Sequence, residues 1–411
     1  MTNLLIGSTA LTTPRDGHSR PMTIVLTGGG SGGHILPVLA VARSLKHQQP
    51  NCRLVYVASK HDKLGDLVKP GGDIDEVKLI SGGKWRRYHG EGWRQLLDLP
   101  TFIKNCRDFF RVILGTLQSL KLLGKLKPDG VFIKGAYVGV PVGWAARWRH
   151  VPYVTLDLDA LPSLANRLIA KHAAAHAVAL PKEIYPYPAD KTFYFGVPVA
   201  EKFSLVTAAQ QATWRQELGL GDYEQVILAV GGGLGATRLN TTIAAQVPKL
   251  FGRYPKMALV HVVGRDHEAD MQRQYDKTLS QSQRARVITK GFIDDLYRYT
   301  GAADLIVSRA GAGSLAEFAA QGKACVIVPN PLLSGGHQLK NAEQLAAHQA
   351  IRVVPETGTK ADENSLSQAI VELLDNPSER TRLGTTLHTF AQPEAANHLA
   401  SLLLETFKSD R

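Results

Sequence analysis

The sequence predicts an α/β protein of two doubly wound domains, each a parallel β-sheet with helices on both faces. Three observations support this prediction. The chain has 411 residues, more than a single hydrophobic core usually organises. Two stretches share one plan, in which an apolar run, a glycine-rich loop and a helical pattern follow one another. Further strand-like runs alternate with helix-length segments in both halves, which is typical of parallel sheets.

The first copy of this plan begins with residues 23–27, an apolar run that we expect to form a buried strand. Glycine-rich residues 28–33 follow, and the apolar spacing from Ile35 to Leu45 predicts a helix. We expect Pro37 in the first turn of that helix, where its missing N–H costs little. Three more strands are predicted at residues 53–58, 130–133 and 152–156.

The second copy begins with residues 225–230, another expected strand. The loop at residues 231–236 precedes a helical pattern that runs from Leu239 to Val247. Three more strands are predicted at residues 257–263, 304–307 and 324–328.

The domain boundary is predicted near residues 196–199, a Gly-Val-Pro-Val turn. We therefore expect domains at residues 22–195 and 196–391. Residues 1–21 read as a loose N-terminal extension, and Met22 is a plausible functional start. Within the C-terminal segment 392–411, residues 394–407 predict one amphipathic helix, and the sequence leaves open whether it packs back on the first domain.

The charge composition indicates which kinds of partner the protein could bind. The formal net charge of +12 favours nucleic acid, an acidic membrane surface or a phosphorylated substrate. Residues 82–127 carry ten Lys/Arg and three Asp/Glu among aromatic and aliphatic residues, which suits an anionic lipid surface. We find no nucleic-acid-binding motif, so we expect no nucleic-acid partner. Three scattered cysteines favour a reducing compartment, and we see neither a signal peptide nor a membrane span.

The two glycine-rich loops predict phosphate sites, because free N–H groups at a helix start attract anions. Both loops also fit a dinucleotide fingerprint. That interpretation requires an acid at the end of the second strand, to bind a ribose. Here that strand ends at Ala58, and the nearest acid, Asp62, lies beyond it. A dinucleotide-dependent oxidoreductase is therefore disfavoured.

A second cluster follows the strand at residues 304–307. We expect a helix to start near Ser314, with Ser314 as its N-cap and a diphosphate held at the free N–H groups. Glu317 suits the two hydroxyls of a ribose, although spacing alone favours a capping-box role with Ser314. Gln338 and Asn341 are three residues apart and share a helix face. Their carboxamides suit sugar hydroxyls, although an ordinary polar surface would look the same.

Together, these segments resemble the MurG family of lipid-linked peptidoglycan N-acetylglucosaminyltransferases, which have the GT-B fold. The matching segments are TGGGSGGHILPVLAVA from Thr27, KPDGVFIKGAYVGVP from Lys127, LANRLIA from Leu164, GVPV from Gly196, VGGGLGATRLN from Val230, GFIDDL from Gly291, SRAGAGSLAEFAAQGKACVIVP from Ser308 and HQLKNA from His337. They occur in the family's order across most of residues 23–355, which is more specific than any single loop.

The resemblance implies that the second domain binds the donor, UDP-N-acetylglucosamine. Its expected contacts are Gly232, Gly233, Phe292, Ile293, Ala312, Gly313, Ser314, Leu315, Glu317, Gln338 and Asn341. The acceptor would be a muramyl-peptide linked through a diphosphate to a polyprenyl chain. Its expected contacts are Gly29, Gly30, Ser31, Gly32, Gly33, Tyr137, Asp159 and Asn166.

The implied reaction inverts the sugar carbon, forms a β-1,4 link and needs a base for the attacking hydroxyl. His34 is the leading candidate, and an orienting or phosphate-binding role for it is equally compatible with the motif. Asp157 and Asp159 are reserve candidates. The resemblance also implies a peripheral location on the cytoplasmic face of the plasma membrane. We expect no required cofactor, with stimulation by divalent ions left open, and we predict no metal site.

Several positions depart from the family pattern. Its His-Glu-x-Asn run aligns with residues 156–159, its arginine after the Gly-x-Pro-Val turn is Ala200, and its Ser-Gln pair is Gly233-Leu234. The departures keep two alternatives open: a transferase for another lipid acceptor, like the diacylglycerol galactosyltransferases, and a weakly active nucleotide-sugar-binding paralogue.

Overall fold

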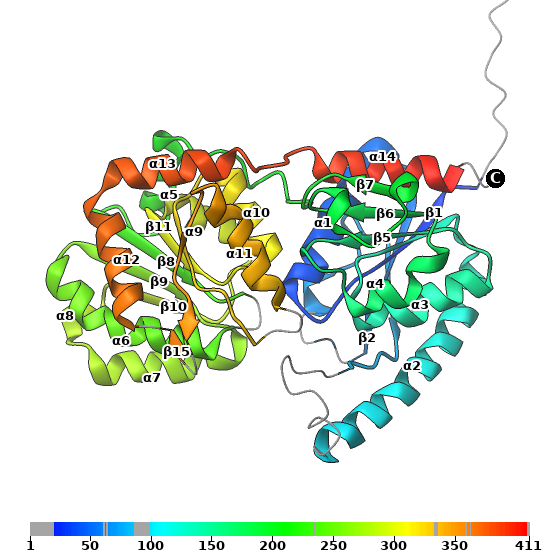
Figure 1. The fold of residues 1–411 in the computed structure, drawn as a ribbon, viewed down its shortest axis with the longest axis horizontal. Coiled ribbons are helices and arrows are strands. Elements are labelled where there is room, and N and C mark those ends of the chain that lie inside the picture. Colours follow the sequence, from blue (N-terminus) through cyan, green and yellow to red (C-terminus); the bar gives the residue numbers. More distant parts are fainter. Residues whose placement is uncertain are drawn as a thin grey trace, which may run out of the picture.

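A computed structural model describes residues 20–60, 62, 65–85, 99–232, 235–332, 336–357, 360–361 and 363–408. It contains two parallel β-sheets with helices on both faces, one in each half of the chain (Figure 1). The predicted fold class, two Rossmann-like doubly wound domains, is thereby confirmed. Most of the predicted extension, residues 1–19, lies outside the described residues.

The first sheet has seven strands. They are β1 (Thr23–Thr27), β2 (Arg53–Ser59), β3 (Glu76–Ile80), β4 (Gly130–Ile133), β5 (Tyr153–Asp157), β6 (Ala175–Val178) and β7 (Thr192–Tyr194). Their order across the sheet is β3-β2-β1-β4-β5-β6-β7, and all pairs are parallel. Successive residues of β4 face opposite sides of the sheet, so Phe132 and Ile133 pack in different cores.

The second sheet repeats this arrangement with six strands. They are β8 (Gln225–Val230), β9 (Met257–Val262), β10 (Val287–Lys290), β11 (Leu305–Ser308), β12 (Cys325–Ile327) and β13 (Arg352–Val353). Their order is β10-β9-β8-β11-β12-β13, again parallel throughout. A small antiparallel pair follows, β14 (Glu356–Thr357) and β15 (Lys360–Ala361).

The helices connect the strands and cover both sheets. In the first half they are α1 (Gly32–Gln48), α2 (Leu99–Leu126), α3 (Ala136–Trp148) and α4 (Leu164–Ile169). In the second half they are α5 (Ala208–Glu217), α6 (Thr237–Arg253), α7 (Glu268–Thr278), α8 (Gln281–Arg284), α9 (Leu296–Ala302), α10 (Ala312–Gln321), α11 (His337–Ala347), α12 (Glu363–Asp375) and α13 (Pro377–His388). Within the described part of the chain, no helix is long and apolar enough to cross a bilayer.

The last helix, α14 (Ala395–Lys408), crosses back to the first domain and packs beside α1 (Figure 1). Its apolar side chains Leu399, Leu403 and Phe407 are buried in the same core as Ile24 of β1. A Cβ atom on Gly130 would lie 2.2 Å from the Phe407 ring, so a glycine is needed beneath that ring.

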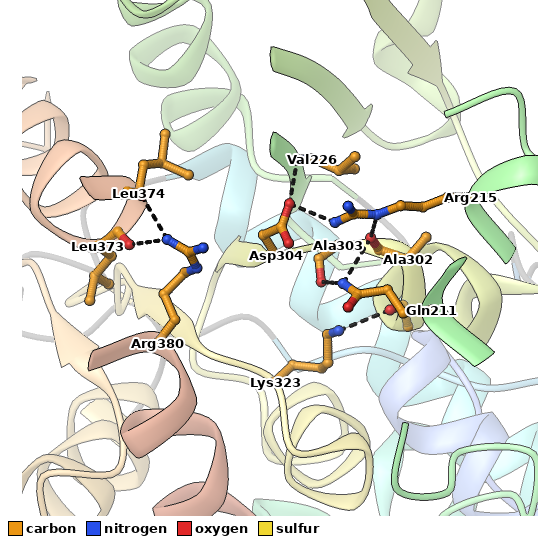
Figure 2. Close-up of polar contacts among 11 residues, drawn as sticks. Gln211, Arg215, Val226, Ala302, Ala303, Asp304, Lys323, Leu373, Leu374 and Arg380 are labelled. Atoms are coloured by element: carbon orange, nitrogen blue, oxygen red, sulfur yellow. Dashed lines mark hydrogen bonds and ion pairs between the residues drawn. The ribbon is translucent and has the colours of Figure 1, made fainter. Parts of the chain in front are cut away.

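Helix α5 follows the inter-domain connection and is held on the second domain by polar contacts (Figure 2). The Arg215 guanidinium donates to the Ala302 carbonyl at 2.9 Å and pairs with Asp304 at 2.6 Å. Gln211 donates to the carbonyls of Ala302 and Ala303, which end α9. These bonds satisfy carbonyl groups that the end of α9 leaves unpaired.

Three of the eight predicted strands, β1, β4 and β8, have the predicted bounds, and the other five differ by one residue at one or both ends. The expected position of Pro37 was wrong. Helix α1 begins at Gly32, so Pro37 lies in its second turn and leaves the Gly33 carbonyl without its helical partner.

Replacing Phe407 by Ala tests whether α14 is an integral part of the first domain. We expect the free energy of unfolding to fall by about 3–5 kcal/mol, because a fully buried ring is removed. Urea unfolding followed by circular dichroism measures it. Glu405→Ala, exposed on the same helix, should change it by less than about 0.5 kcal/mol. Equal effects of the two substitutions would contradict the packing.

Candidate functional site

The two sheets present their carboxyl edges to one inter-domain region. In each sheet the strand order reverses at one point, between β1 and β4 and between β8 and β11. Ligands of doubly wound domains bind at such points, where the two loops diverge. Helices α1 and α10, which begin at these points, are in contact with each other (Figure 1).

The loop after β1 is held by three neighbours. Tyr56 donates its hydroxyl to the Gly28 carbonyl at 2.8 Å, and Asp62 accepts the Gly30 N–H at 2.8 Å. Gly30 has a φ of 83°, and a Cβ there would lie 2.9 Å from the Tyr137 ring. Asp62 therefore binds the glycine loop itself, which further disfavours a dinucleotide site.

The N-terminus of α1 is open to an anion. Its N-cap, Ser31, makes no side-chain capping bond, and no acid occupies the first turn. The Ser31 hydroxyl instead lies 2.9 Å from Nδ1 of His34. The N–H groups at the helix start, on Gly32 and Gly33, thus have no side-chain cap.

His34 is half-buried in the first turn of α1. Its pKa is lowered to about 3, mainly by burial and in addition by the positive charge of Lys134. The imidazole is therefore neutral at physiological pH. If Nδ1–H donates to Ser31, Nε2 keeps its lone pair and can accept a proton.

Asp159 reaches across the cleft. The Asn341 amide donates to Asp159 Oδ1 at 2.9 Å, and the Ala160 N–H donates to Asn341 Oδ1 at 3.3 Å. A residue predicted for the acceptor and one predicted for the donor are thus brought together. A second link joins the domains at Arg265 and Asp66, 2.7 Å apart.

The other two candidates near Asp159 lie inside the protein. Asp157 accepts the Ser163 N–H at 3.0 Å and the Tyr187 hydroxyl at 2.7 Å, so both carboxylate oxygens are occupied. Asn166 is fully buried and donates to the Leu156 carbonyl at 2.9 Å. Asn166 braces the loop after β5 and does not line the open cleft.

The capping role predicted for Ser314 was wrong. Helix α10 begins at Ala312, with Gly311 as N-cap, so Ser314 is the third helical residue and the capping box with Glu317 is absent. The N-cap lies three residues earlier than expected because Gly311 is the last residue in an extended conformation (φ −71°, ψ 132°) and the helix follows it directly. Free N–H groups remain on Ala312, Gly313 and Ser314, and no acid lies in the first turn.

Glu317 lies one turn further along α10 and is half-buried. It makes no hydrogen bond or ion pair with another described residue. Burial raises the pKa of its carboxyl to about 7, opposed by the charge of Lys202. An unpaired carboxylate beside free N–H groups can accept hydrogen bonds from a diol whose phosphate those N–H groups bind.

Gln338 and Asn341 share the buried face of α11, as their spacing predicts. Gln338 accepts the Asn330 N–H at 2.9 Å through Oε1, which leaves its amide to donate. Gly232 has a φ of 88° after β8, while Gly233 and Leu234 lie outside the described residues.

The remaining donor candidates lie near the same cleft. Phe292 and Ile293 follow β10, and the Arg265 guanidinium stacks 4.7 Å from the Phe292 ring centre. A largely apolar cavity of about 430 Å³ lies between the domains. Ala312, Leu315 and Asn341 line it, and so does Ala200, where the family pattern has an arginine.

Sequence reasoning missed two features of this region. Asp62 was considered only as a ribose ligand, whereas it orders the first glycine loop. Lys134, a buried lysine, follows β4. A lysine at the end of an apolar strand is the only sequence signal that could have singled it out. Among the described residues, His, Cys, Asp and Glu form no group of three that could hold a metal ion.

Comparisons with known proteins agree with this geometry. Residues 24–178 match the glycosyltransferase family 28 N-terminal domain, and residues 226–399 match its C-terminal domain. Enzymes named UDP-N-acetylglucosamine–N-acetylmuramyl-(pentapeptide) pyrophosphoryl-undecaprenol N-acetylglucosamine transferase are similar. The one from Moorella thermoacetica is 29% identical over 94% of this chain and 100% of its own. The one from Bacillus subtilis is 27% identical over the same shares.

The crystal structure of Acinetobacter baumannii MurG superposes with a TM-score of 0.65 at 24% identity. The match covers 94% of this chain and all of that one, which supports the GT-B arrangement. With two family domains in order and full-length relatives, this chain belongs to glycosyltransferase family 28, in its MurG branch.

Proposed function

We propose that this protein transfers N-acetylglucosamine from UDP-N-acetylglucosamine to the 4-hydroxyl of an undecaprenyl-diphosphate-linked N-acetylmuramyl-peptide, with inversion at the sugar carbon. The names of the relatives supply the two substrates. One observation supports the proposal most strongly. Glu317, whose carboxylate has no partner among the described residues, lies one turn from the open N-terminus of α10. A nucleoside diphosphate presents both the diol and the anion that these groups fit.

On the donor side, the N–H groups of Ala312 to Ser314 would hold the diphosphate and Glu317 the ribose. As the bond to the sugar breaks, negative charge grows on the departing diphosphate. The N-terminal end of α10 is the positive end of its dipole, and it would stabilise that charge. Gln338 would contact the sugar through its amide, whereas the Asn341 amide already donates to Asp159 and Ala310 and would have to exchange one of these bonds to do so. No resident cofactor enters this proposal.

On the acceptor side, His34 would take the proton of the attacking hydroxyl. Its imidazole is neutral and the Ser31 hydroxyl would hold the tautomer with Nε2 free, although the lowered pKa makes this nitrogen a weak base in the unliganded protein. Asp157 is a weaker candidate because hydrogen bonds occupy both of its oxygens. Tyr137 and the loop from Gly29 to Gly33 would surround the acceptor diphosphate.

Helix α2 supports a peripheral position on an anionic membrane. Several large apolar side chains on it are exposed, which is unusual for a surface helix of a globular protein. They are Phe102, Ile103, Phe109, Phe110, Ile113, Leu114 and Leu117. Lys104, Arg107 and Lys121 are exposed on the same helix, as an interfacial helix requires. The rest of the basic cluster, residues 86–98, lies outside the described residues.

Transfer of labelled sugar to a short-chain lipid acceptor tests the proposal. We expect β-linked product with UDP-N-acetylglucosamine and little with UDP-galactose. Preference for UDP-galactose with diacylglycerol would favour the alternative acceptor class. Nucleotide binding without turnover under all conditions would indicate a non-catalytic paralogue and reject the proposal.

The pH dependence of donor binding tests Glu317. Its pKa of about 7 implies that UDP-N-acetylglucosamine binds more tightly as the pH rises through about 7, since the carboxylate is the better acceptor. The same raised pKa means that the unliganded fold loses stability as the pH rises from about 4.5 to about 7. Glu317→Gln should bind about tenfold more weakly at high pH and lose the dependence. Titration calorimetry with the nucleotide sugar measures the affinity at each pH, and the diphosphate itself does not titrate in this range. An equal pH dependence in Glu317→Gln and the wild-type protein would contradict the proposed role of Glu317.

Removal of the imidazole tests His34. We expect His34→Ala to lower kcat by about 10²–10⁴-fold with the donor affinity unchanged, because the base is lost. His172→Ala, exposed on the first domain, is the matched control. A rise in acceptor KM with kcat retained would assign His34 to substrate orientation instead.

The exposed face of α2 can be tested with vesicles. We expect the double substitution Phe109→Ser and Phe110→Ser to weaken binding to anionic phospholipid vesicles at least about tenfold, because each exposed ring would be buried in the interface. Leu168→Ser, similarly exposed on α4, should leave binding unchanged. Sedimentation with vesicles measures the bound fraction. An equal loss of binding in the Leu168→Ser control would contradict a membrane-binding role for α2.

A further inference from the structure

We propose that Lys134 binds a phosphate oxygen of the lipid-linked acceptor. The identity of the acceptor rests on the proposed function. The assignment of Lys134 to it rests on the position, burial and surroundings of this side chain.

Lys134 extends β4 by one residue, because its N–H donates to the Thr27 carbonyl of β1 at 2.9 Å. Side chains alternate along a strand, so Lys134 points to the same side of the sheet as Phe132. Phe132 packs in the core that contains α1 and α14. The Lys134 side chain therefore lies on the α1 side of the sheet, at the edge where α1 begins.

Lys134 is only 3% exposed. It forms no ion pair and no side-chain hydrogen bond with any residue that the structure describes. The two carboxylates whose charges act on Lys134 bind other groups, Asp157 the Ser163 N–H and the Tyr187 hydroxyl, and Asp159 the Asn341 amide. A buried ammonium without a contacting counter-ion costs several kcal/mol in a typical protein.

The start of α1 adds to the excess of positive charge around Lys134. A helix N-terminus carries a partial positive charge, and α1 has no acid in its first turn to offset it. A buried cation beside the positive end of a helix is unfavourable unless an anion lies between them. The free N–H groups of Gly32 and Gly33 and the Lys134 ammonium together form such a site.

The turn that follows Lys134 is itself strained. Gly135 and Ala136 have φ values of 75° and 60°, and the second is unusual for a residue with a side chain. A Cβ on Gly135 would lie 2.8 Å from the Ser163 hydroxyl, so the close approach requires glycine. Strain of this kind is retained where a backbone position serves a ligand.

The acceptor, rather than the donor, is the source of the phosphate. Lys134 and α1 both belong to the first domain. The second domain has its own anion site at α10, adjacent to Glu317. With the acceptor diphosphate at the start of α1 and the donor diphosphate at the start of α10, each site binds one substrate.

Two acceptors and one substitution test this inference. The acceptors are a short-chain polyprenyl-diphosphate muramyl-peptide and the matching alkyl glycoside, which lacks the diphosphate. We expect the wild-type enzyme to prefer the diphosphate form in kcat/KM, and Lys134→Met to lose about 10- to 100-fold on that form only. The affinity for UDP-N-acetylglucosamine should not change, and thermal stability should be equal or higher because a buried charge is removed.

Lys134→Gln serves as a second variant, and Lys171→Met, which removes an exposed charge from the same domain, is the control. An unchanged preference in both Lys134 variants would overturn the inference. A matching loss of donor affinity would overturn the assignment to the acceptor. Absence of transfer by the wild-type enzyme to either acceptor would instead reject the proposed function.

Discussion

Each domain places the free N–H groups of a helix at the carboxyl edge of a parallel sheet, and the site depends on this constraint. Helices α1 and α10 start at the two points where strand order reverses, and they contact each other across the domains. The two proposed anion sites therefore face one cleft. Different side chains lie beside the two sites, His34 and Lys134 beside the first and Glu317 beside the second. Two helix starts of similar geometry can thus serve different substrates.

Much of the fold could be predicted because buried parallel strands are continuous apolar runs. β1, β4 and β8 lie in the middle of their sheets, and their bounds were predicted without error. The strands not named in advance are mostly edge strands, such as β3 and β7, which are short and partly exposed. Their sequences mix polar and apolar residues, so no strong pattern marks them.

The candidate site could be predicted only in part. Sequence motifs indicated which loops would meet, and Gln338 and Asn341 do share a buried face. The N-cap of α10 was misplaced by three residues, since the capping residue is Gly311 and not Ser314. The positions of Asp62, Asn341 and Lys134 depend on partners far apart in the chain, which local patterns do not record. The contact of Asn341 with Asp159 joins residues 182 positions apart.

A crystal structure with UDP-N-acetylglucosamine tests most directly whether the start of α10 binds the donor and the start of α1 does not. The account predicts the diphosphate on the N–H groups of Ala312 to Ser314, the ribose hydroxyls on Glu317, and the loop at residues 28–33 free of nucleotide. A nucleotide diphosphate bound at the start of α1, with Glu317 away from the ribose, would contradict it.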